Sequence, residues 1–406
     1  MKINLDRLKN DLEALAQIGR DPRGGVTRPS FSQADLEARR WLKDKIEQAG
    51  LCCRQDGAGN IFCRLGGDGR AVLVGSHIDT VINGGKFDGS AGVLAGLECL
   101  RVIKETGASF GKPIELVAFT DEEGNLVGDF LGSRAFAGLL NKDEIEKGMT
   151  SFGRPLKDIL AGTEFSVESI LEAHKARPEI EAFLELHIEQ GSGLEIEDVP
   201  IGIVERIAGK RYFWCSFVGR ADHGGTTPLE LRHDAFLATA DFALKGTQLV
   251  ATRHYGSMVT VGRVSVHPGS FSVVPGQVDF SLDFRSSSSE TLKTLETGLL
   301  ALAGDIASTR GLAFHSRLID QTEPVELSSQ IIEIMKEECG RLQYPYLMMM
   351  SGAGHDAQIV SSLADSGMIF IPCVDGISHS PAEMINWKDL EKGANLLLHT
   401  LLRLAK

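Results

Sequence analysis

The sequence predicts an α/β fold in which a ferredoxin-like domain is inserted into a larger domain. Short apolar strands alternate with helices through the first part of the chain, which is typical of a mostly covered sheet. Between residues 208 and 322 the order changes to strand–helix–strand–strand–helix–strand, the split-βαβ pattern. The alternating pattern then returns. We therefore predict one domain from residues 1–207 and 323–406 and a second domain from residues 208–322.

Helical spacing and capping signals define the first elements of the larger domain. Leucines at positions 5, 8, 12 and 15 fall on one face and predict a helix over residues 4–18. Ser32 and Asp35 resemble a capping box that opens a helix ending near Gln48. Further helices are expected over residues 89–103, 331–339 and 387–402. β-rich or apolar runs predict strands at residues 51–54, 61–65, 71–75, 114–120 and 368–372.

The inserted segment is predicted from the same signals. Four runs with β character predict strands at residues 211–219, 258–266, 278–285 and 312–318. Two runs with helical periodicity predict helices at residues 231–244 and 290–308. A unit with this order can fold alone, which is why we expect an insertion rather than a continuation of the first sheet.

Charge and cysteine content exclude several classes of protein. The 406 residues include 42 Lys and Arg against 55 Asp and Glu, a net charge of −13, so nucleic acid and anionic membranes are not expected partners. The seven cysteines are scattered without a C-x-x-C pair, which fits a reducing compartment. The N-terminal region has no apolar signal sequence, and no apolar run is long enough to span a membrane. We therefore expect a cytoplasmic protein.

Three histidines stand at the expected carboxyl ends of strands, where α/β sheets place their sites. His77 and His187 follow apolar runs directly, and His379 comes shortly after the strand that ends near Pro372. Asp88 lies in a glycine-rich loop that leads into a helix. Glu123 belongs to an Asp-Glu-Glu run after another strand, where like charges repel unless a cation neutralises them.

This set of imidazoles and carboxylates predicts a pair of divalent metal ions. The ligand types suit zinc or manganese, and cobalt or nickel as well, better than magnesium or calcium. Five protein ligands suffice for two four-coordinate ions if one carboxylate and one water bridge them. The alternative is a solvated acidic loop with incidental histidines. The proposed ligands are His77, Asp88, Glu123, His187 and His379.

Seven ordered segments carry a resemblance to a known family. They are residues 75–81, 83–89, 120–124, 185–191, 222–228, 351–357 and 376–383. In these segments the chain resembles the hydantoinase/carbamoylase branch of the M20 metallopeptidase-like amidohydrolases. The resemblance implies an M20-type catalytic domain with the inserted domain acting as a lid. It also implies that Asp88 bridges the two metals and that Glu122 is the general base.

The resemblance further implies a homodimer formed through the inserted domain. In this arrangement His223 of the lid donates a hydrogen bond to the oxyanion formed in the partner's site. Substrate binding is implied for Gln190, Arg211, Arg285 and His355, the arginines being suited to a carboxylate. Ser272 stands where ureido-hydrolysing members usually have asparagine, and residues 125–129 depart from the usual Arg-Phe continuation.

The expected function is hydrolysis of a linear C–N bond in a small carboxylate-bearing substrate. An N-carbamoyl-L-amino acid is the favoured substrate. Allantoate is the first alternative, and another N-acyl amino acid or a dipeptide-like amide is the second, made more plausible by Ser272. Two other hypotheses are an aminopeptidase and a non-catalytic binding protein on the same fold. An aminopeptidase would turn over peptides with a free α-amine. A binding protein would hold no divalent metal and would show no hydrolysis after metal addition.

Overall fold

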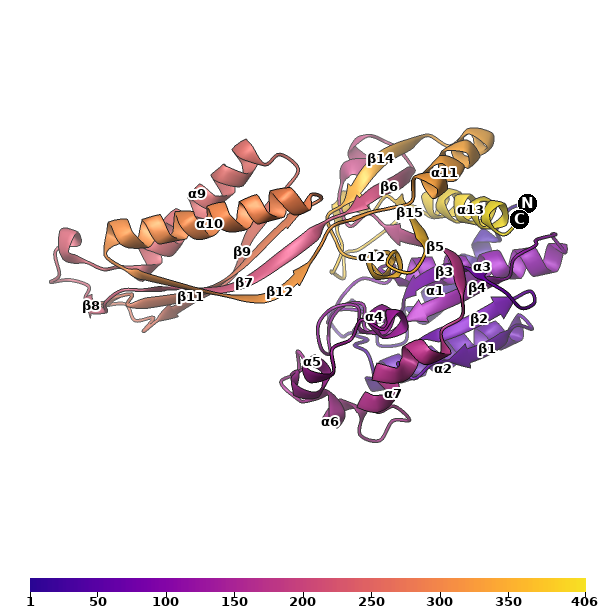
Figure 1. Ribbon diagram of the computed structural model, residues 1–406, viewed down its shortest axis with the longest axis horizontal. Helices are drawn as coiled ribbons and strands as arrows, with labels where there is room; N and C mark the ends of the chain where they lie inside the picture. The colour runs from indigo at the N-terminus through magenta and orange to yellow at the C-terminus, as the bar shows by residue number, and fades with distance from the viewer. The chain divides into compact units, whose positions relative to one another are not determined.

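The computed structural model describes all residues from Met1 to Lys406. The chain divides into two compact units, one made of Met1–Glu205 with Glu326–Lys406 and the other of Arg206–Val325. Each unit has its own sheet (Figure 1). The mixed α/β composition predicted from the sequence is confirmed.

The first unit is built on a nine-stranded sheet. Its main path has the order β1-β2-β4-β3-β5-β15-β6-β13, and β14 pairs with β6. The strands are β1 (Cys52–Gln55), β2 (Ile61–Leu65), β3 (Ala71–His77), β4 (Ile114–Phe119), β5 (Ile180–Ile188), β6 (Ile201–Ile207), β13 (Val325–Glu326), β14 (Tyr346–Ser351) and β15 (Asp365–Ile371).

Four neighbouring strands in the middle of this sheet run parallel. β3 pairs in parallel with both β4 and β5, and β5 pairs in parallel with β15. Their residues are almost all buried, as expected for strands covered on both faces. Because the carboxyl ends of parallel strands meet at one edge, the segments that follow β3, β4, β5 and β15 converge there.

Helices cover this sheet. α3 (Ser90–Thr106) packs on β3, β4 and β5 and lies against α13 (Trp387–Leu404) and α1 (Leu5–Leu15). α2 (Gln33–Gln48) packs against β1 and β2, and Ser32 caps its first turn as predicted, by accepting from the Asp35 backbone N–H. This unit also contains α8 (Gly193–Ile196), α11 (Ser329–Leu342), α12 (Asp356–Val360) and the 3₁₀ turn Val374–Gly376.

The segment between β4 and β5 contains short helices that the sequence did not reveal. They are α4 (Leu131–Ala137), α5 (Lys142–Lys147), α6 (Leu156–Leu160) and α7 (Val167–Glu172), followed by the 3₁₀ turn Ala173–Ala176. They share a separate apolar cluster that includes Leu126, Leu131 and Phe165. Helices this short show too few turns for a periodic pattern to stand out.

The second unit has a four-stranded antiparallel sheet in the order β12-β7-β11-β9. Helices α9 and α10 lie side by side on it (Figure 1). Side chains from both layers, including Phe217, Phe242 and Phe280, form its own core. The elements are β7 (Gly209–Val218), β8 (Asp222–His223), the 3₁₀ turn Leu229–Leu231, α9 (Ala235–Arg253), β9 (Met258–His267), β10 (Val273–Val274), β11 (Gln277–Ser286), α10 (Ser289–Arg310) and β12 (Ala313–Thr322).

The predicted start of the helix at residue 231 was wrong. The side chain of Asp234 accepts hydrogen bonds from the backbone N–H groups of Phe236 and Leu237, so α9 begins at Ala235. The same helix continues to Arg253, beyond the predicted end at Leu244. Neither α9 nor any other helix of the chain is both long enough and apolar enough to cross a membrane.

Candidate metal and active site

The five predicted metal ligands lie together in the first unit. His77 is the last residue of β3, His187 lies near the end of β5, and Glu123 follows β4. Asp88 precedes α3, and His379 follows the 3₁₀ turn after β15. The parallel strands therefore place residues far apart in sequence at one edge of the sheet. Two ligand groups result, His77–Asp88–His187 and Asp88–Glu123–His379, each with its ligand atoms within 4.8 Å of one another.

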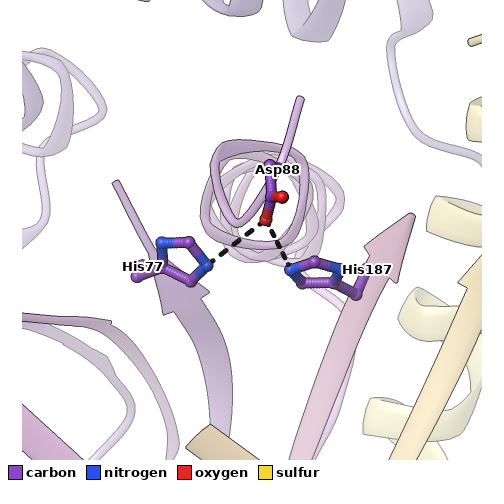
Figure 2. Close-up of side chains that lie close together, drawn as sticks. All are labelled: His77, Asp88 and His187. Atoms are coloured by element: carbon purple, nitrogen blue, oxygen red, sulfur yellow. Dashed lines mark ion pairs between the residues drawn. The ribbon is translucent and has the colours of Figure 1, made fainter. Parts of the chain in front are cut away.

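The Asp88 carboxylate is shared between these two groups. Its Oδ1 lies 3.6 Å from His77 Nε2 and 3.1 Å from His187 Nε2 (Figure 2). Its Oδ2 lies 3.3 Å from His379 Nε2. One carboxylate oxygen thus faces His77 and His187, and the other faces His379.

Backbone contacts fix which ring nitrogens of His77 and His187 face Asp88. His77 Nδ1 lies 3.1 Å from the Asp79 carbonyl oxygen, and His187 Nδ1 lies 2.9 Å from the Ile188 carbonyl oxygen. Nδ1–H groups that donate to carbonyls leave both Nε2 atoms unprotonated, so each can act as an acceptor or a metal ligand. Gly89 N–H donates to His187 Nε2, while His77 Nε2 is buried and has no hydrogen-bond partner.

Gly89 permits this close packing of the loop against His77. Its φ of +60° lies in the left-handed region, and a Cβ atom there would come within 2.4 Å of the His77 ring. A residue with a side chain would therefore displace either the ring or the loop that carries Asp88.

Glu122 lies beside the His77 side of the cluster. The Glu122 Oε2 atom is 3.5 Å from His77 Nε2, and Glu122 as a whole is 8% exposed. The Asp79 carboxylate accepts hydrogen bonds from the backbone N–H groups of Glu122 and Glu123 at 3.4 Å. The His77 ring is oriented by the backbone carbonyl of Asp79, 3.1 Å from Nδ1, because the nearest carboxylate oxygen of Asp79 is farther away, at 3.7 Å.

Burial and interactions among the charged groups strongly shift the pKa values of the side chains in this cluster. Burial raises the pKa of Glu122 well above its usual range and raises the pKa of Glu123 to about 8. A hydrogen bond with Asp88 raises the pKa of His379 to about 9. Burial opposes ionisation of Asp88, but its histidine partners outweigh that effect and lower its pKa. Several buried carboxylates that repel one another are an environment in which a cation is favoured.

Gln190 lies within the same cluster. Its Nε2 donates to Asp88 Oδ2 at 2.8 Å and is 3.3 Å from His379 Nε2, while its Oε1 is buried without a partner. The side chain is therefore positioned against the proposed bridging carboxylate.

His355 lies behind His187, with ring centroids 4.6 Å apart. Burial lowers the pKa of His355 well below its usual range, and its Nε2 is 2.9 Å from Ser351 Oγ. Two further compact sets of possible ligand atoms are formed by Glu185, His187 and His355 and by His77, Glu122 and Glu123. Glu185, however, already accepts hydrogen bonds from Ser76 Oγ and from the Ala357 backbone.

Glu383 contacts the site, and sequence reasoning assigned it no role. Its Oε1 accepts hydrogen bonds from the backbone N–H groups of Phe87 and Asp88, at 2.8 and 3.2 Å. Ser378 Oγ lies 2.9 Å from both Asp88 Oδ2 and Glu383 Oε2. Glu383 is the last residue of the segment 376–383, so its only signal in the sequence is its position near His379.

His223 and Ser272 come together within the second unit. The β8–β10 ribbon pairs His223 with Val273, and the Gly224 N–H donates to the Ser272 carbonyl. His223 Nδ1 accepts from the Gly225 and Thr226 backbone at 3.1 and 3.2 Å. The proton of the neutral ring is therefore on Nε2, which makes that atom a hydrogen-bond donor.

The two predicted substrate arginines also lie in the second unit and contact protein carboxylates there. Arg211 is buried and pairs with Glu323, and its Nη1 donates to the Thr322 carbonyl. Arg285 lies 3.0 Å from Asp283 and donates to the Tyr212 hydroxyl. The Arg285 side chain is 30% exposed, against 4% for Arg211.

Comparison with known proteins places this arrangement in a family. Residues 73–403 match Peptidase family M20/M25/M40. An N-carbamoyl-L-amino-acid amidohydrolase of Paenarthrobacter aurescens is 36% identical, with 98% of each chain covered. An allantoate amidohydrolase of Escherichia coli is 34% identical, covering 98% of this chain and 97% of that protein.

A solved structure gives the same result. A hydantoinase/carbamoylase family amidase from Burkholderia multivorans has a TM-score of 0.90 and 34% identity, covering 100% of this chain and 98% of that one. Both the matched length and the identity to full-length relatives confirm the resemblance found in the sequence. The chain belongs to Peptidase family M20/M25/M40 and is similar to its hydantoinase/carbamoylase members.

Proposed function

We propose that this chain is a metal-dependent amidohydrolase that cleaves a linear ureido C–N bond in a small carboxylate-bearing molecule. An N-carbamoyl-L-amino acid is the favoured substrate, with the amino acid, carbon dioxide and ammonia as products. The observation that carries the proposal is the Asp88 carboxylate, whose two oxygens face different imidazole groups beside Glu122. The names of the full-length relatives support the type of bond.

The donor set fits two divalent ions. His77 Nε2 is a buried nitrogen without a partner, and two compact ligand groups share Asp88. His77, Asp88 and His187 would hold one ion, and Asp88, Glu123 and His379 the other. When bound, such ions polarise a carbonyl and make water acidic enough to ionise near neutral pH. Zinc and manganese suit these ligands, and cobalt and nickel are compatible with them.

Glu122 is proposed as the general base. It would take a proton from the water that attacks the carbonyl carbon and deliver that proton to the leaving nitrogen. Its carboxylate lies 3.5 Å from His77 Nε2 and outside the two ligand groups that share Asp88, which supports a role in proton transfer. Glu122 also forms a compact set with His77 and Glu123. The buried surroundings of Glu122 limit competition from bulk water.

We assign the second unit a role as an inserted lid and dimerisation domain. Its strand–helix–strand–strand–helix–strand order and its own core support a ferredoxin-like domain over about residues 208–322. The apolar side chains of Phe236, Leu237 and Leu244 are exposed on α9, where a second copy of the chain would cover them. His223 of the partner's lid would donate its Nε2–H to the oxyanion.

The substrate carboxylate is assigned to the lid arginines. Arg285 is the more accessible of the two, so a substrate would compete with Asp283 for it. Arg211, Gln190, Ser272 and His355 are proposed to shape the remainder of the binding site. A cytoplasmic location is proposed as well, supported by seven cysteines that are all free.

Ammonia release tests the proposal directly. Purified protein loaded with Zn²⁺ or Mn²⁺ would be compared with chelated protein on N-carbamoyl-L-amino acids, allantoate and N-acyl amino acids. Metal-dependent turnover of the N-carbamoyl compounds supports the main proposal, and preference for allantoate supports the alternative that the Escherichia coli relative suggests. Absence of hydrolysis of every substrate after metal loading would contradict both.

A further inference from the structure

Two cysteines face each other at the edge of the large sheet. β1 is the edge strand, and it pairs with β2 in an antiparallel hairpin. In this register Cys53 is directly opposite Cys63. Residues opposite one another on neighbouring strands point to the same face of the sheet, so the two thiols share one face.

Hydrogen bonding in the hairpin fixes the type of this pair. The Asp56 N–H donates to the Asn60 carbonyl at 3.1 Å, which makes residues 56 and 60 a hydrogen-bonded pair. Such pairs alternate with non-hydrogen-bonded ones along an antiparallel ladder. With no register shift between them, Cys53 and Cys63 form a non-hydrogen-bonded pair. Cα atoms in pairs of this kind are about 4.5 Å apart, within the range of about 4.4–6.8 Å that a disulfide spans.

The two thiols differ in their access to solvent. Cys63 is fully buried, whereas Cys53 is partly exposed on the edge strand. Cys52 is exposed, but as the next residue along the strand it points to the opposite face. An oxidant therefore reaches Cys53 from solvent, and Cys63 is the thiol that lies next to it.

We propose that Cys53 and Cys63 are an oxidative modification site at which a peroxide forms a cross-strand disulfide. In the first step the Cys53 sulfur attacks the peroxide O–O bond, giving a sulfenic acid and releasing one water from hydrogen peroxide. In the second step the Cys63 sulfur attacks the Cys53 sulfur, forming the S–S bond as the hydroxyl leaves as a second water. Two electrons pass from the thiol pair to one peroxide.

Oxidation of Cys53 and formation of the disulfide would be slow at neutral pH and faster at alkaline pH. Burial raises the pKa of the Cys63 thiol to about 12 and also raises the pKa of Cys53. Because the thiolate is the nucleophile, both steps accelerate as pH rises. This site is independent of the proposed hydrolytic function.

The hairpin is connected to the segment that carries Glu122. Asn60 Oδ1 accepts a hydrogen bond from the Thr120 N–H at 3.0 Å, and Arg39 donates to Thr120 Oγ1 at 3.1 Å. The turn of the β1–β2 hairpin therefore contacts the residue that follows β4. A cross-link between β1 and β2 would form in this same hairpin.

Peptide mapping tests the proposal with the native protein. After treatment with hydrogen peroxide at mildly alkaline pH, free thiols are alkylated and the protein is digested with trypsin. Cleavage after Lys45, Arg54 and Arg64 separates the two cysteines into the peptides 46–54 and 55–64. The expected product is these two peptides joined, lighter than their sum by two hydrogens and released by dithiothreitol.

The Cys52→Ser variant is the matched control, because residue 52 shares the tryptic peptide with Cys53. This variant should keep the linked peptide, and Cys53→Ser should lose it. Loss of the link in Cys52→Ser would overturn the assignment. The proposal is equally overturned if oxidised wild-type protein contains modified Cys53 while Cys63 is recovered as a free, alkylated thiol.

Discussion

Glu383 holds the backbone of Asp88 in place, although 295 positions separate them in the sequence. One Glu383 oxygen accepts from the N–H groups of Phe87 and Asp88, and Ser378 Oγ lies between the two carboxylates. Gly85 leaves room for this contact, since a Cβ there would lie 1.9 Å from the Glu383 carboxyl carbon. The residue proposed to bridge the metals is thus positioned by a carboxylate outside the two ligand groups.

Glu383→Ala should weaken metal binding without removing a proposed ligand. Loss of an outer partner of this kind typically costs about 10–100-fold in metal affinity. The measurement is the Zn²⁺ or Mn²⁺ dissociation constant from competition with a chelator. Gly85→Ala should act in the same direction, because it displaces Glu383. Glu37→Ala on the exposed face of α2 is the control, and equal affinities in Glu383→Ala and Glu37→Ala would contradict the positioning role.

The strand ends at the site were predictable because local signals define them. Apolar runs that stop at His77 and His187 identify strands by themselves, and parallel pairing then brings their ends together. The roles assigned to these side chains stay predictions. Glu383 could not be found in the same way, because the backbone N–H groups that donate to it belong to residues almost three hundred positions away and meet it only after the chain has folded. Helices α4–α7 escaped prediction because each is only five to seven residues long.

Glu122 and Glu123 are adjacent, yet their substitution by glutamine should have different consequences. Glu122→Gln keeps the ligand groups and removes the base, so turnover should fall by about 10²–10⁴-fold with metal content unchanged. Glu123→Gln removes a proposed ligand of the second ion, so metal content should fall as well. Metal analysis alongside ammonia release distinguishes them. Near-normal turnover by Glu122→Gln would remove it from the base role.

Metal binding should strengthen as pH rises from about 6 to 8. The pKa of His379 in the metal-free protein is about 9, so its Nε2 is protonated at neutral pH. A ligand nitrogen must lose its proton to bind, and each rise in pH lowers the cost of that step. Dissociation constants measured across this range should therefore decrease. His379→Ala should bind more weakly with a shallower pH dependence, whereas an unchanged slope would show that another group supplies the proton.

Arg285→Ala should raise KM for carboxylate substrates about ten- to hundredfold, because charge-assisted hydrogen bonds contribute about 1.5–3 kcal/mol. The value of kcat should change less, since the contact is to a part of the substrate that does not react. Arg263→Ala is the matched control, as Arg263 is an exposed arginine on the neighbouring strand β9. Equal KM values for Arg285→Ala and Arg263→Ala would exclude Arg285 from carboxylate binding.

Arg28 stabilises the loop that follows His77. Its fully buried guanidinium donates to the carbonyls of Ile78, Leu15 and Ile18 at 2.6–3.0 Å, and burial lowers its pKa to about 10. Arg28→Leu leaves these carbonyls without their donors, and each such buried group costs about 1–3 kcal/mol. The free energy of unfolding in urea should therefore fall by at least about 3 kcal/mol. Arg40→Leu, at an exposed position of α2, should change it by less than about 0.5 kcal/mol. Similar losses in both variants would show that the Arg28 contacts contribute no more than an exposed side chain.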